Sequence, residues 1–473
     1  MFAPGSHGFL RRCTPLPCPK TPLGGTSGAV ACAIAVVRPL AHPHDRQILR
    51  LALPALGALA AEPLYVLADT AVVGRLGTPQ LGGLAVASTL LLTGYAVFNF
   101  LAYGTTASVA RRLGAGDDAG AAHEGVQGMW LALGIGLIIA VAGLALAPYA
   151  VSVMGATGAV RANALVYLRI SLVGVPALLV TLAGTGYLRG RQNTVTPLAV
   201  TTAAVLANLA IELVLIYGVG FGIGASALST VVVQLASAGA YGWWVSRDVR
   251  ALGVRIRPEL AAIRRLAVVG RDLFVRTAAL RLTLTLATAV AARLGPVDLG
   301  AHQIAFELWS FLALVLDSLA IAGQAMIGRL LGSGDAVAAR VAGRRMIEWG
   351  VGAGVVFAVL VGLGRTLLPR LFTGDPDVVA LAGFVLVFVA ALQPVNAVVF
   401  VLDGVLIGAG DMRYLAWAMA GAAVVFVPAA GAVLALGWGI GWLWACLGLL
   451  MVTRAAALGW RFAGGAWAVE GAR

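Results

Sequence analysis

Charged residues are scarce in this sequence. They make up 11% of the 473 residues, against about 25% in an ordinary soluble protein, while 60% of the residues are hydrophobic. A surface so poor in charge cannot keep a body of this size dissolved in water. The composition therefore excludes a water-soluble enzyme, a disordered regulator and a secreted disulfide scaffold, and it indicates an integral membrane protein.

Lysine, cysteine and histidine are also rare, and each shortage excludes a kind of site. Lys20 is the only lysine, so a phosphate-binding Walker loop, which needs this residue, is excluded. The four cysteines show neither CxxC nor His-paired spacing, and the histidines have neither metal-ligand spacing nor a catalytic Ser or Cys partner. We therefore expect no metal site, no organic cofactor and no enzyme activity.

The positive charge that is present, 33 Lys and Arg against 20 Asp and Glu, lies between apolar runs. A nucleic-acid-binding surface would gather it with aromatic residues on a polar face, so no nucleic-acid partner is expected. Arginines concentrate on one side of the predicted membrane, which the positive-inside rule assigns to the cytoplasm together with both termini. The other side carries only Arg75, Arg161, Arg293, Arg365 and Arg370.

Twelve apolar stretches are each about 20 residues long, the length of a helix that crosses about 30 Å of hydrocarbon. Because they are continuous and not alternating, they predict helices and not barrel strands. The predicted fold class is therefore an all-α integral membrane protein with twelve transmembrane helices. The stretches are approximately 51–73, 84–110, 126–147, 165–187, 197–217, 224–245, 273–294, 302–328, 347–368, 380–403, 414–436 and 440–462.

The sequence repeats itself at an offset of 218 residues. Residues 75–77 (Arg-Leu-Gly) recur at 293–295, and the motif Leu-Gly-x-Gly-Asp occurs at 113–117 and again at 331–335. Matches at one constant offset over this length are not expected by chance. The chain therefore consists of two copies of a six-helix unit. An even number of helices makes the copies parallel, an architecture of transporters that bind substrate between the halves and rock one half against the other.

The repeat predicts the domain organisation. A first lobe covers residues 45–245 and a second lobe covers 273–465, joined by an Arg-rich cytoplasmic linker at 246–272. Residues 1–44 are rich in proline and contain no stretch long enough to span a membrane. We expect this N-terminal extension to be disordered, or to result from a mis-annotated gene start.

Several motifs resemble those of multidrug and toxic compound extrusion (MATE) transporters, of the DNA-damage-inducible F (DinF) type. They are Ala-Glu-Pro-Leu-Tyr at 61–65, Asp-Thr-Ala-Val-Val-Gly at 69–74, the motif at 113–117, Gly-Ala-His-Gln-Ile at 300–304 and Leu-Ile-Gly-Ala-Gly-Asp at 406–411. The resemblance covers about residues 45–465. It implies a V-shaped pair of six-helix bundles in a bacterial cytoplasmic membrane, acting as a monomer. The implied activity is export of small organic cations in exchange for H⁺ or Na⁺.

Two intramembrane acids occur in the first lobe and have no acidic counterpart in the second lobe. Asp69 aligns with Ala287 in the second copy, and Glu212 aligns with Ala429 or Ala430. A structural role shared by both copies would keep the acid in both, and a buried ionisable residue in a membrane is a functional candidate by default. We therefore expect the cation-coupling site in the first lobe.

Polar residues accompany both acids at helical spacing. Tyr65 lies four residues before Asp69 and Asn208 lies four before Glu212, while Thr230 adds a hydroxyl from the sixth span. Their oxygens suit a proton or Na⁺, although Tyr65, Asn208 and Thr230 can also serve only as helix–helix hydrogen bonds. The MATE resemblance places the matching positions in a first-lobe pocket, with Glu212 where an Asp is expected. We favour H⁺, because a carboxyl group removed from water holds its proton more readily.

Further candidates lie elsewhere in the spans. Glu62 lies seven residues before Asp69 on the same helical stripe. Arg281 has no acid in its own turn, so it is a candidate partner for Asp69 or another central carboxylate. Asp317 and Asp403 align with polar residues of the first copy, which favours a structural role over cation binding. Arg276 is expected to pair with Asp272, four residues before it.

Two prolines in the first span predict a hinge. Pro54 and Pro63 each remove a backbone hydrogen bond, and Pro63 lies six residues before Asp69. A bend that depends on the protonation of Asp69 would couple the ion to the lobe movement; the alternative is a static kink.

The sequence also allows two other functions to be considered for a protein of this architecture. A flippase for lipid-linked oligosaccharides would line its cavity with several Arg or Lys, whereas the spans hold only Arg169, Arg276, Arg281 and Arg454. A polytopic transferase would need clustered Asp or His in a polar loop, which the linker does not offer.

Overall fold

The computed structural model describes residues 43–471, apart from the side chains of 93 and 95–97. In this range the chain consists of helices joined by short turns and contains no β-strand. The first repeat forms α2 (Pro43–Gly74), α3 (Thr78–Val97), α4 (Phe100–Gly114), α5 (Asp118–Val153), α6 (Gly158–Gly190), α7 (Val195–Leu213), the π-helix η1 (Val214–Gly218) and α8 (Gly224–Ala251). The second repeat forms α9 (Leu260–Leu294), α10 (Pro296–Gly332), α11 (Ala336–Gly364), the 3₁₀ helix η2 (Leu368–Leu371), α12 (Pro376–Gly408), α13 (Met412–Ala435) and α14 (Ile440–Gly464).

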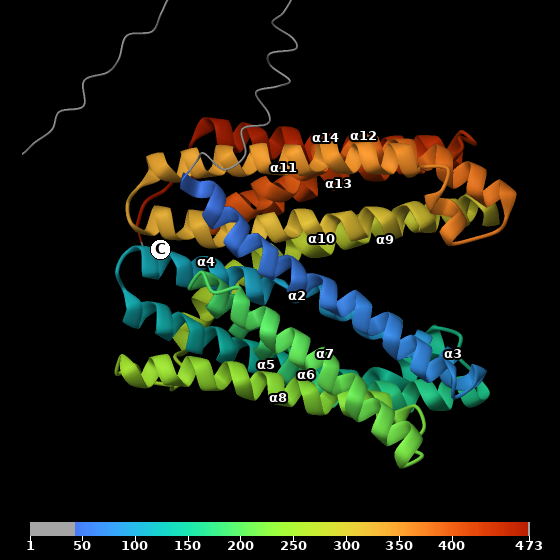
Figure 1. The fold of residues 1–473 in the computed structure, drawn as a ribbon, viewed down its shortest axis with the longest axis horizontal. Helices are drawn as coiled ribbons and strands as arrows, with labels where there is room; N and C mark the ends of the chain where they lie inside the picture. Colours follow the sequence, from blue (N-terminus) through green and yellow to red (C-terminus); the bar gives the residue numbers. More distant parts are fainter. Residues whose placement is uncertain (1–42, 472–473) are drawn as a thin grey trace, which may run out of the picture. The chain divides into compact units, whose positions relative to one another are not determined.

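The all-α membrane fold is confirmed. Within the described residues, ten helices are long and apolar enough to cross a membrane, with α7 counted together with η1. The two remaining predicted stretches, 84–110 and 224–245, correspond to α3 with α4 and to α8. The helices of each repeat lie mainly together, as the colours in Figure 1 show.

The second predicted span is not one helix, and in this detail the prediction was wrong. The chain leaves the helix at Phe98 and Asn99, between α3 and α4. An Asn side chain competes with the backbone for hydrogen bonds, which disfavours a helix interior. Packing also favours the break, because the rings of Phe98 and Phe100 both contact Phe274 of α9, with centroids 6.2 and 6.3 Å away.

The first helix begins earlier than expected and stays helical through its prolines. α2 starts at Pro43, where proline suits the first turn because that N–H has no partner in a helix. Residues 43 and 44 therefore belong to α2, and the rest of the predicted extension lies outside the described residues. Pro54 and Pro63 both lie inside the continuous helix.

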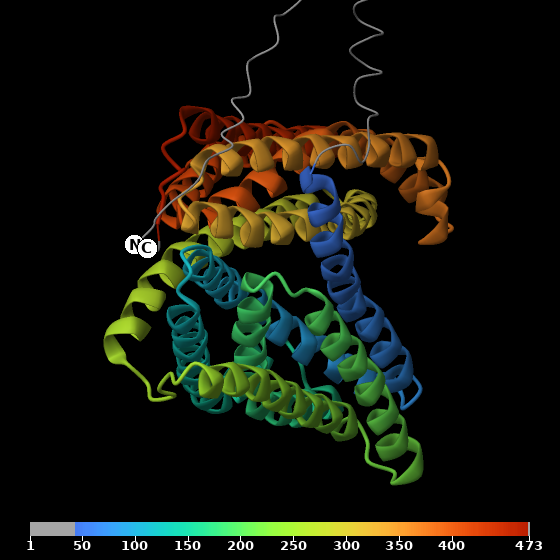
Figure 2. The ribbon, with the colours of Figure 1, turned by 60° about the vertical axis from the view of Figure 1, so that its left-hand side comes forward.

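α2 contacts both repeats. Near its start, Asp45 accepts hydrogen bonds from Arg345 Nε at 2.6 Å and from Trp349 Nε1 at 2.9 Å, both on α11 of the second repeat. Further along, Gly57 lies directly against Leu198 of α7, in the first repeat. Figure 2 shows α2 running from the helices of the second repeat to α7. A change in the shape of α2 would therefore alter its contacts with both repeats.

α4 and α10 cross in backbone contact at their C-terminal ends. A Cβ atom on Gly114 would lie 2.1 Å from the carbonyl oxygen of Arg329, and one on Gly332 would lie 2.1 Å from that of Arg111. Gly114 and Gly332 occupy the same place in the two copies of the Leu-Gly-x-Gly-Asp motif. We call this contact the crossing. It holds the repeats together at one end of the helices.

A short C-terminal segment, residues 465–471, covers the crossing. The Arg111 guanidinium of α4 donates a hydrogen bond to the carbonyl oxygen of Val469. The amide of Gly471 donates to the carbonyl oxygen of Leu331 of α10, at 2.9 Å. The segment, which we call the strap, therefore bonds to both repeats.

The strap is anchored by a buried tryptophan. Trp467 is 1% exposed, its ring stacks on that of Phe462, and its Nε1 donates to the Phe462 carbonyl oxygen at 2.9 Å. The carboxylate of Glu470 accepts a hydrogen bond from the amide of Ala336 at 3.2 Å, at the start of α11. These contacts fix the strap on the second repeat.

The connection between the repeats is shorter than the predicted linker at 246–272. α8 continues to Ala251 and α9 begins at Leu260, so only residues 252–259 are outside a helix. This connection is tied to α5: Gln127 donates to the Arg257 carbonyl at 3.0 Å and accepts from the Glu259 amide at 2.8 Å.

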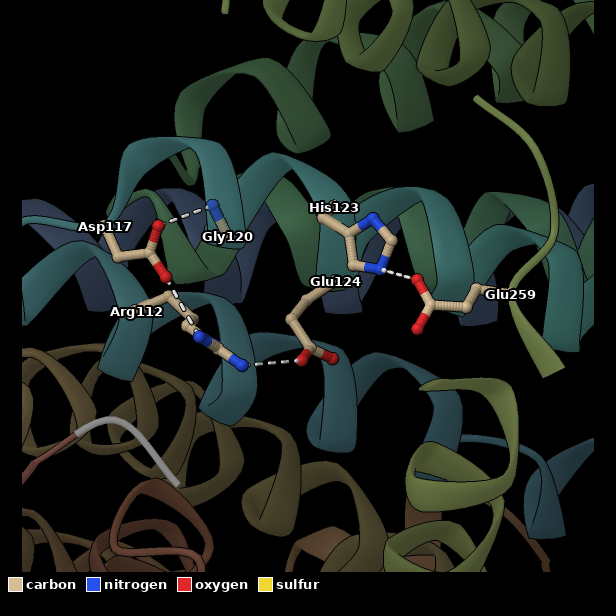
Figure 3. A network of polar contacts seen from close by, with 6 residues as sticks. All are labelled: Arg112, Asp117, Gly120, His123, Glu124 and Glu259. Carbon is tan, nitrogen blue, oxygen red and sulfur yellow. Dashed lines mark hydrogen bonds and ion pairs between the residues drawn. The ribbon is translucent and has the colours of Figure 1, made fainter. Parts of the chain in front are cut away.

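A polar network lies beside this connection (Figure 3). His123 of α5 contacts Glu259 at 3.2 Å, while Arg112 of α4 bridges Asp117 at 2.9 Å and Glu124 at 3.4 Å. The Asp117 carboxylate also accepts from the Gly120 amide and so caps α5. The network joins α4, α5 and the connection at the end of the helices where the crossing lies.

Candidate functional site

Three helices of the first repeat, α2, α7 and α8, bring two acids together. Ser226 Oγ of α8 donates a hydrogen bond of 2.5 Å to Asp69 Oδ1 of α2. Glu212 of α7 lies beside both residues. Asp69 and Glu212 are 5% and 0% exposed, so the pair is removed from water.

A second layer of hydrogen bonds surrounds the hydroxyl of Thr230. The Asn208 side-chain amide donates to Thr230 Oγ1 at 3.2 Å, and the Tyr65 hydroxyl contacts the same atom at 3.2 Å. Thr230 and Ser226 are four residues apart on α8, so they lie on one face of the helix. This layer holds α2, α7 and α8 in register around the two acids.

The cluster has more acceptors than donors. The Asn208 Oδ1 atom and both carboxylate oxygens of Glu212 are buried and accept no hydrogen bond of good geometry among the described residues, although Glu212 lies against Asp69 and Ser226. The ion pairs of the described chain involve other acids, so neither Asp69 nor Glu212 has a basic partner there. A buried carboxylate without a partner is costly, so the arrangement favours binding of a proton or a cation.

α7 ends in an unusual geometry directly after Glu212. Residues Val214–Gly218 form the π-helix η1, in which Val219 N donates to the carbonyl oxygen of Val214 at 3.2 Å. Single π-helical turns are rare and often occur at functional sites. The wider turn sets the direction in which the chain leaves the acid pair.

Most of the predicted coupling residues meet in this cluster. The structure brings together Asp69, Glu212, Asn208, Thr230 and Tyr65. The sequence reasoning missed Ser226, although its spacing of four residues from Thr230 was a usable signal. Glu62 is exposed and makes no hydrogen bond within the described chain.

Arg281 is not brought into an ion pair. Its side chain is exposed on α9, and no described acid lies within ion-pair distance of it. The structure therefore does not bring Arg281, a candidate partner from the sequence, to Asp69 or to another central carboxylate.

The second repeat instead contains a compensated acid. Asp403 Oδ2 of α12 accepts from the guanidinium of Arg276 on α9 and, at 2.7 Å, from that of Arg454 on α14. The expected pairing of Arg276 with Asp272 was wrong: Asp272 pairs with Arg271 at 3.1 Å. Asp403 therefore ties three helices together with its charge already balanced.

Asp317 lies where the repeats face each other. It accepts a hydrogen bond of 3.4 Å from the Tyr103 hydroxyl of α4, across the boundary between the repeats. Arg189 and Arg276 lie near it. Unlike Asp69 and Glu212, this acid therefore has basic neighbours. No group of three or more His, Cys, Asp or Glu that could hold a metal occurs in residues 43–471.

Comparisons with known proteins point to one family. A family model described as MatE matches residues 54–214 and again residues 274–430. Protein DETOXIFICATION 44, chloroplastic, from Arabidopsis thaliana is 32% identical over 428 residues, which cover 88% of this chain and 81% of that protein. DNA damage-inducible protein F from Escherichia coli (strain K12) is 29% identical over 425 residues, 88% and 92% of the two chains. A crystal structure of MATE in the bent conformation superposes with a TM-score of 0.80 at 19% identity, covering 91% of this chain and 96% of that one.

Proposed function

The chain belongs to the MatE family of multidrug and toxic compound extrusion transporters, and on this premise we propose that it is an antiporter which exports small organic cations in exchange for H⁺. It is a multi-pass membrane protein and not an enzyme. The proposed location is a bacterial cytoplasmic membrane, with both termini in the cytoplasm and the crossing on that side.

The uncompensated acid pair is the observation that carries this proposal. Asp69 and Glu212 are buried side by side without a basic partner in the described chain. Two charged carboxylates in one dry site repel each other strongly, which favours the uptake of a proton or a cation there. A proton on one acid removes the repulsion and supplies a donor for a neighbouring acceptor. Na⁺ coupling is the alternative.

α2 is the element that would transmit the protonation. It carries Asp69 near one end and, near the other, Asp45, which binds Arg345 and Trp349 of the second repeat. Pro63 lies between them and weakens the helix on the Asp69 side. A bend of α2 that differs between the two charge states would alter the acid cluster and the contact between the repeats together. This supplies a two-state element biased by one proton.

The decisive experiment is transport by the purified chain in lipid vesicles. A pH gradient and a Na⁺ gradient are imposed separately, and the movement of a fluorescent organic cation is followed. We expect the pH gradient alone to drive transport and Glu212→Gln to abolish it. Glu307→Gln is the matched control, since Glu307 is exposed and outside the cluster. Transport that follows Na⁺ at fixed pH would overturn the choice of H⁺.

A further inference from the structure

The segment that joins α11 to α12 departs from its counterpart in the first repeat. α11 ends at Gly364, whereas α5 continues to Val153, the position that corresponds to 371 at the offset of 218 residues. Where α11 ends, the second repeat has Gly364 and Pro369 in place of Leu146 and Val151, whereas α5 stays helical through Pro148. Glycine has a low helix propensity, and proline at 369 cannot donate to the carbonyl oxygen of Arg365. The second repeat therefore loses about two helical turns here.

The shortened helix leaves a cleft of about 730 Å³ between this segment and the start of α12. Two arginines, Arg365 and Arg370, line it together with Thr366, Thr373 and Phe384. These are two of the five arginines on the arginine-poor side of the protein. In the first repeat their places are taken by Ala147 and Ser152. The charge in the cleft is thus specific to the second repeat.

Neither arginine is neutralised within the described chain. Both side chains are exposed, and no ion pair involves them among residues 43–471. The nearest acid along the sequence, Asp375, has its Oδ1 occupied by the amides of Asp377 at 2.9 Å and Val378 at 3.4 Å. The cleft therefore presents two guanidinium groups to an outside ligand.

The segment that carries the two arginines also exposes apolar side chains. Leu363, Leu367 and Leu371 are 79%, 62% and 73% exposed, and each is a near neighbour in sequence of an arginine of the cleft. α11 has 29 residues and is therefore about 43 Å long, which exceeds the roughly 30 Å hydrocarbon layer. A helix of this length reaches beyond the hydrocarbon layer, which allows its last residues to lie at the level of the headgroups. Figure 1 shows this connection at the end of the helices opposite the C-terminus of α4.

We propose that this cleft binds the phosphate of an anionic phospholipid, with Arg365 and Arg370 on the headgroup and the acyl chains on Leu363, Leu367 and Leu371. Guanidinium groups match phosphate oxygens with paired hydrogen bonds. Basic side chains at the ends of membrane helices reach naturally to the headgroup level. Free phosphate would use the arginines but gain nothing from the three exposed leucines, so the charge and the neighbouring apolar side chains together favour a lipid.

Native mass spectrometry of the purified full chain tests the proposal. The chain is titrated with phosphatidylglycerol or with phosphatidylcholine, which carries no net charge. We expect the first phosphatidylglycerol to bind more tightly than phosphatidylcholine. The double variant Arg365→Gln, Arg370→Gln should weaken it about thirtyfold. The control variant Arg75→Gln, Arg161→Gln removes the same charge on the same side outside the cleft, and it should keep the preference. Equal binding of the two lipids, or equal loss in the two double variants, overturns the proposal.

Hydrogen exchange in nanodiscs locates the lipid and separates it from free phosphate. Amides of residues 364–375 should exchange more slowly in phosphatidylglycerol than in phosphatidylcholine, while those of the counterpart, 146–157, should not change. The protection should disappear in the Arg365→Gln, Arg370→Gln variant and persist in the control variant. Inorganic phosphate added to phosphatidylcholine nanodiscs should have no such effect. If it reproduces the protection, the ligand is a free anion and the lipid assignment is wrong.

Discussion

Gly114 and Gly332 stand in equivalent places of the two repeats, and each fits against the backbone of the helix that carries the other. Each approach leaves no room for a side chain, because a Cβ at either position would lie 2.1 Å from a carbonyl oxygen. Backbone atoms, unlike a flexible side chain, cannot move aside alone. The close contact of the two repeats at this end therefore depends on glycine at both positions.

Gly114→Ala is expected to open the crossing. The added methyl must separate α4 from α10, and overpacking of this kind costs about 1–3 kcal/mol, which shifts a two-state equilibrium about fivefold or more. The distribution of distances between spin labels at the C-terminal ends of α4 and α10 should shift toward longer distances. Gly134→Ala is the matched control, since a Cβ there meets no atom within 4 Å. An unchanged distance distribution in Gly114→Ala would contradict the role of the crossing.

Asp69→Asn is expected to abolish gradient-driven export. The change keeps the shape and can still accept from Ser226, but it removes the group that takes up the proton. Transport in vesicles should fall to the background of empty vesicles, while the yield and thermal unfolding of the protein stay near those of the unsubstituted chain. If Asp69→Asn exports dye at the normal rate, the coupling site lies elsewhere.

Ser226→Ala is expected to slow export without destroying the cluster. It removes the donor to Asp69 Oδ1, and a hydrogen bond to a charged group contributes about 1.5–3 kcal/mol. At a limiting pH gradient the rate should fall roughly tenfold. Ser229→Ala is the control on the same helix, because within residues 43–471 its hydroxyl donates to the Ser226 carbonyl oxygen and to neither acid. Equal rates in the two variants would exclude a role for the Ser226 hydroxyl.

Asp403→Asn is expected to destabilise the protein. Asp403 is the shared ion-pair partner of Arg276 and Arg454 in the interior, and removal of one partner from a buried ion pair costs about 3–5 kcal/mol. Thermal unfolding in detergent should show a clearly lowered Tm, whereas Glu307→Gln should not. Retained stability with lost transport would instead support cation binding at Asp403.

Pro63→Ala is expected to slow transport while drug affinity stays nearly unchanged. Alanine restores the backbone hydrogen bond to Leu59 and stiffens α2 near Asp69. The transport turnover rate and the dissociation constant of the drug are both measured for Pro63→Ala and for the unsubstituted chain. Spin-label distances between α2 and α8 that do not change with pH in the unsubstituted chain would rule out a proton-driven bend.

The membrane fold was predictable because its determinants are local or repeat along the chain. Apolar length indicates each span, and the 218-residue offset appears in the motif at 113–117 and 331–335. The acid cluster was found because Asp69 and Glu212 lack counterparts in the second copy.

The failures concern contacts between distant segments. Asp403 and Arg276 are 127 residues apart, and Asp45 and Arg345 are 300 apart, so no helical spacing indicates either pair. The break at Asn99 depends on packing against Phe274 of another helix. These pairings are decided by the tertiary arrangement, which spacing along one helix does not encode.

The strap also dictates an order of events during synthesis. Arg111 and its partner Val469 are 358 residues apart in the chain. At a translation rate of roughly 5–20 residues per second, the ribosome makes the second residue about 20–70 s after the first. The bond therefore cannot exist until nearly the whole chain has been made, and the first repeat has this interval in which to insert and pack in the bilayer. The joined arrangement of the two repeats is completed only once residue 469 has emerged, so it is among the last native contacts to form in each newly made molecule.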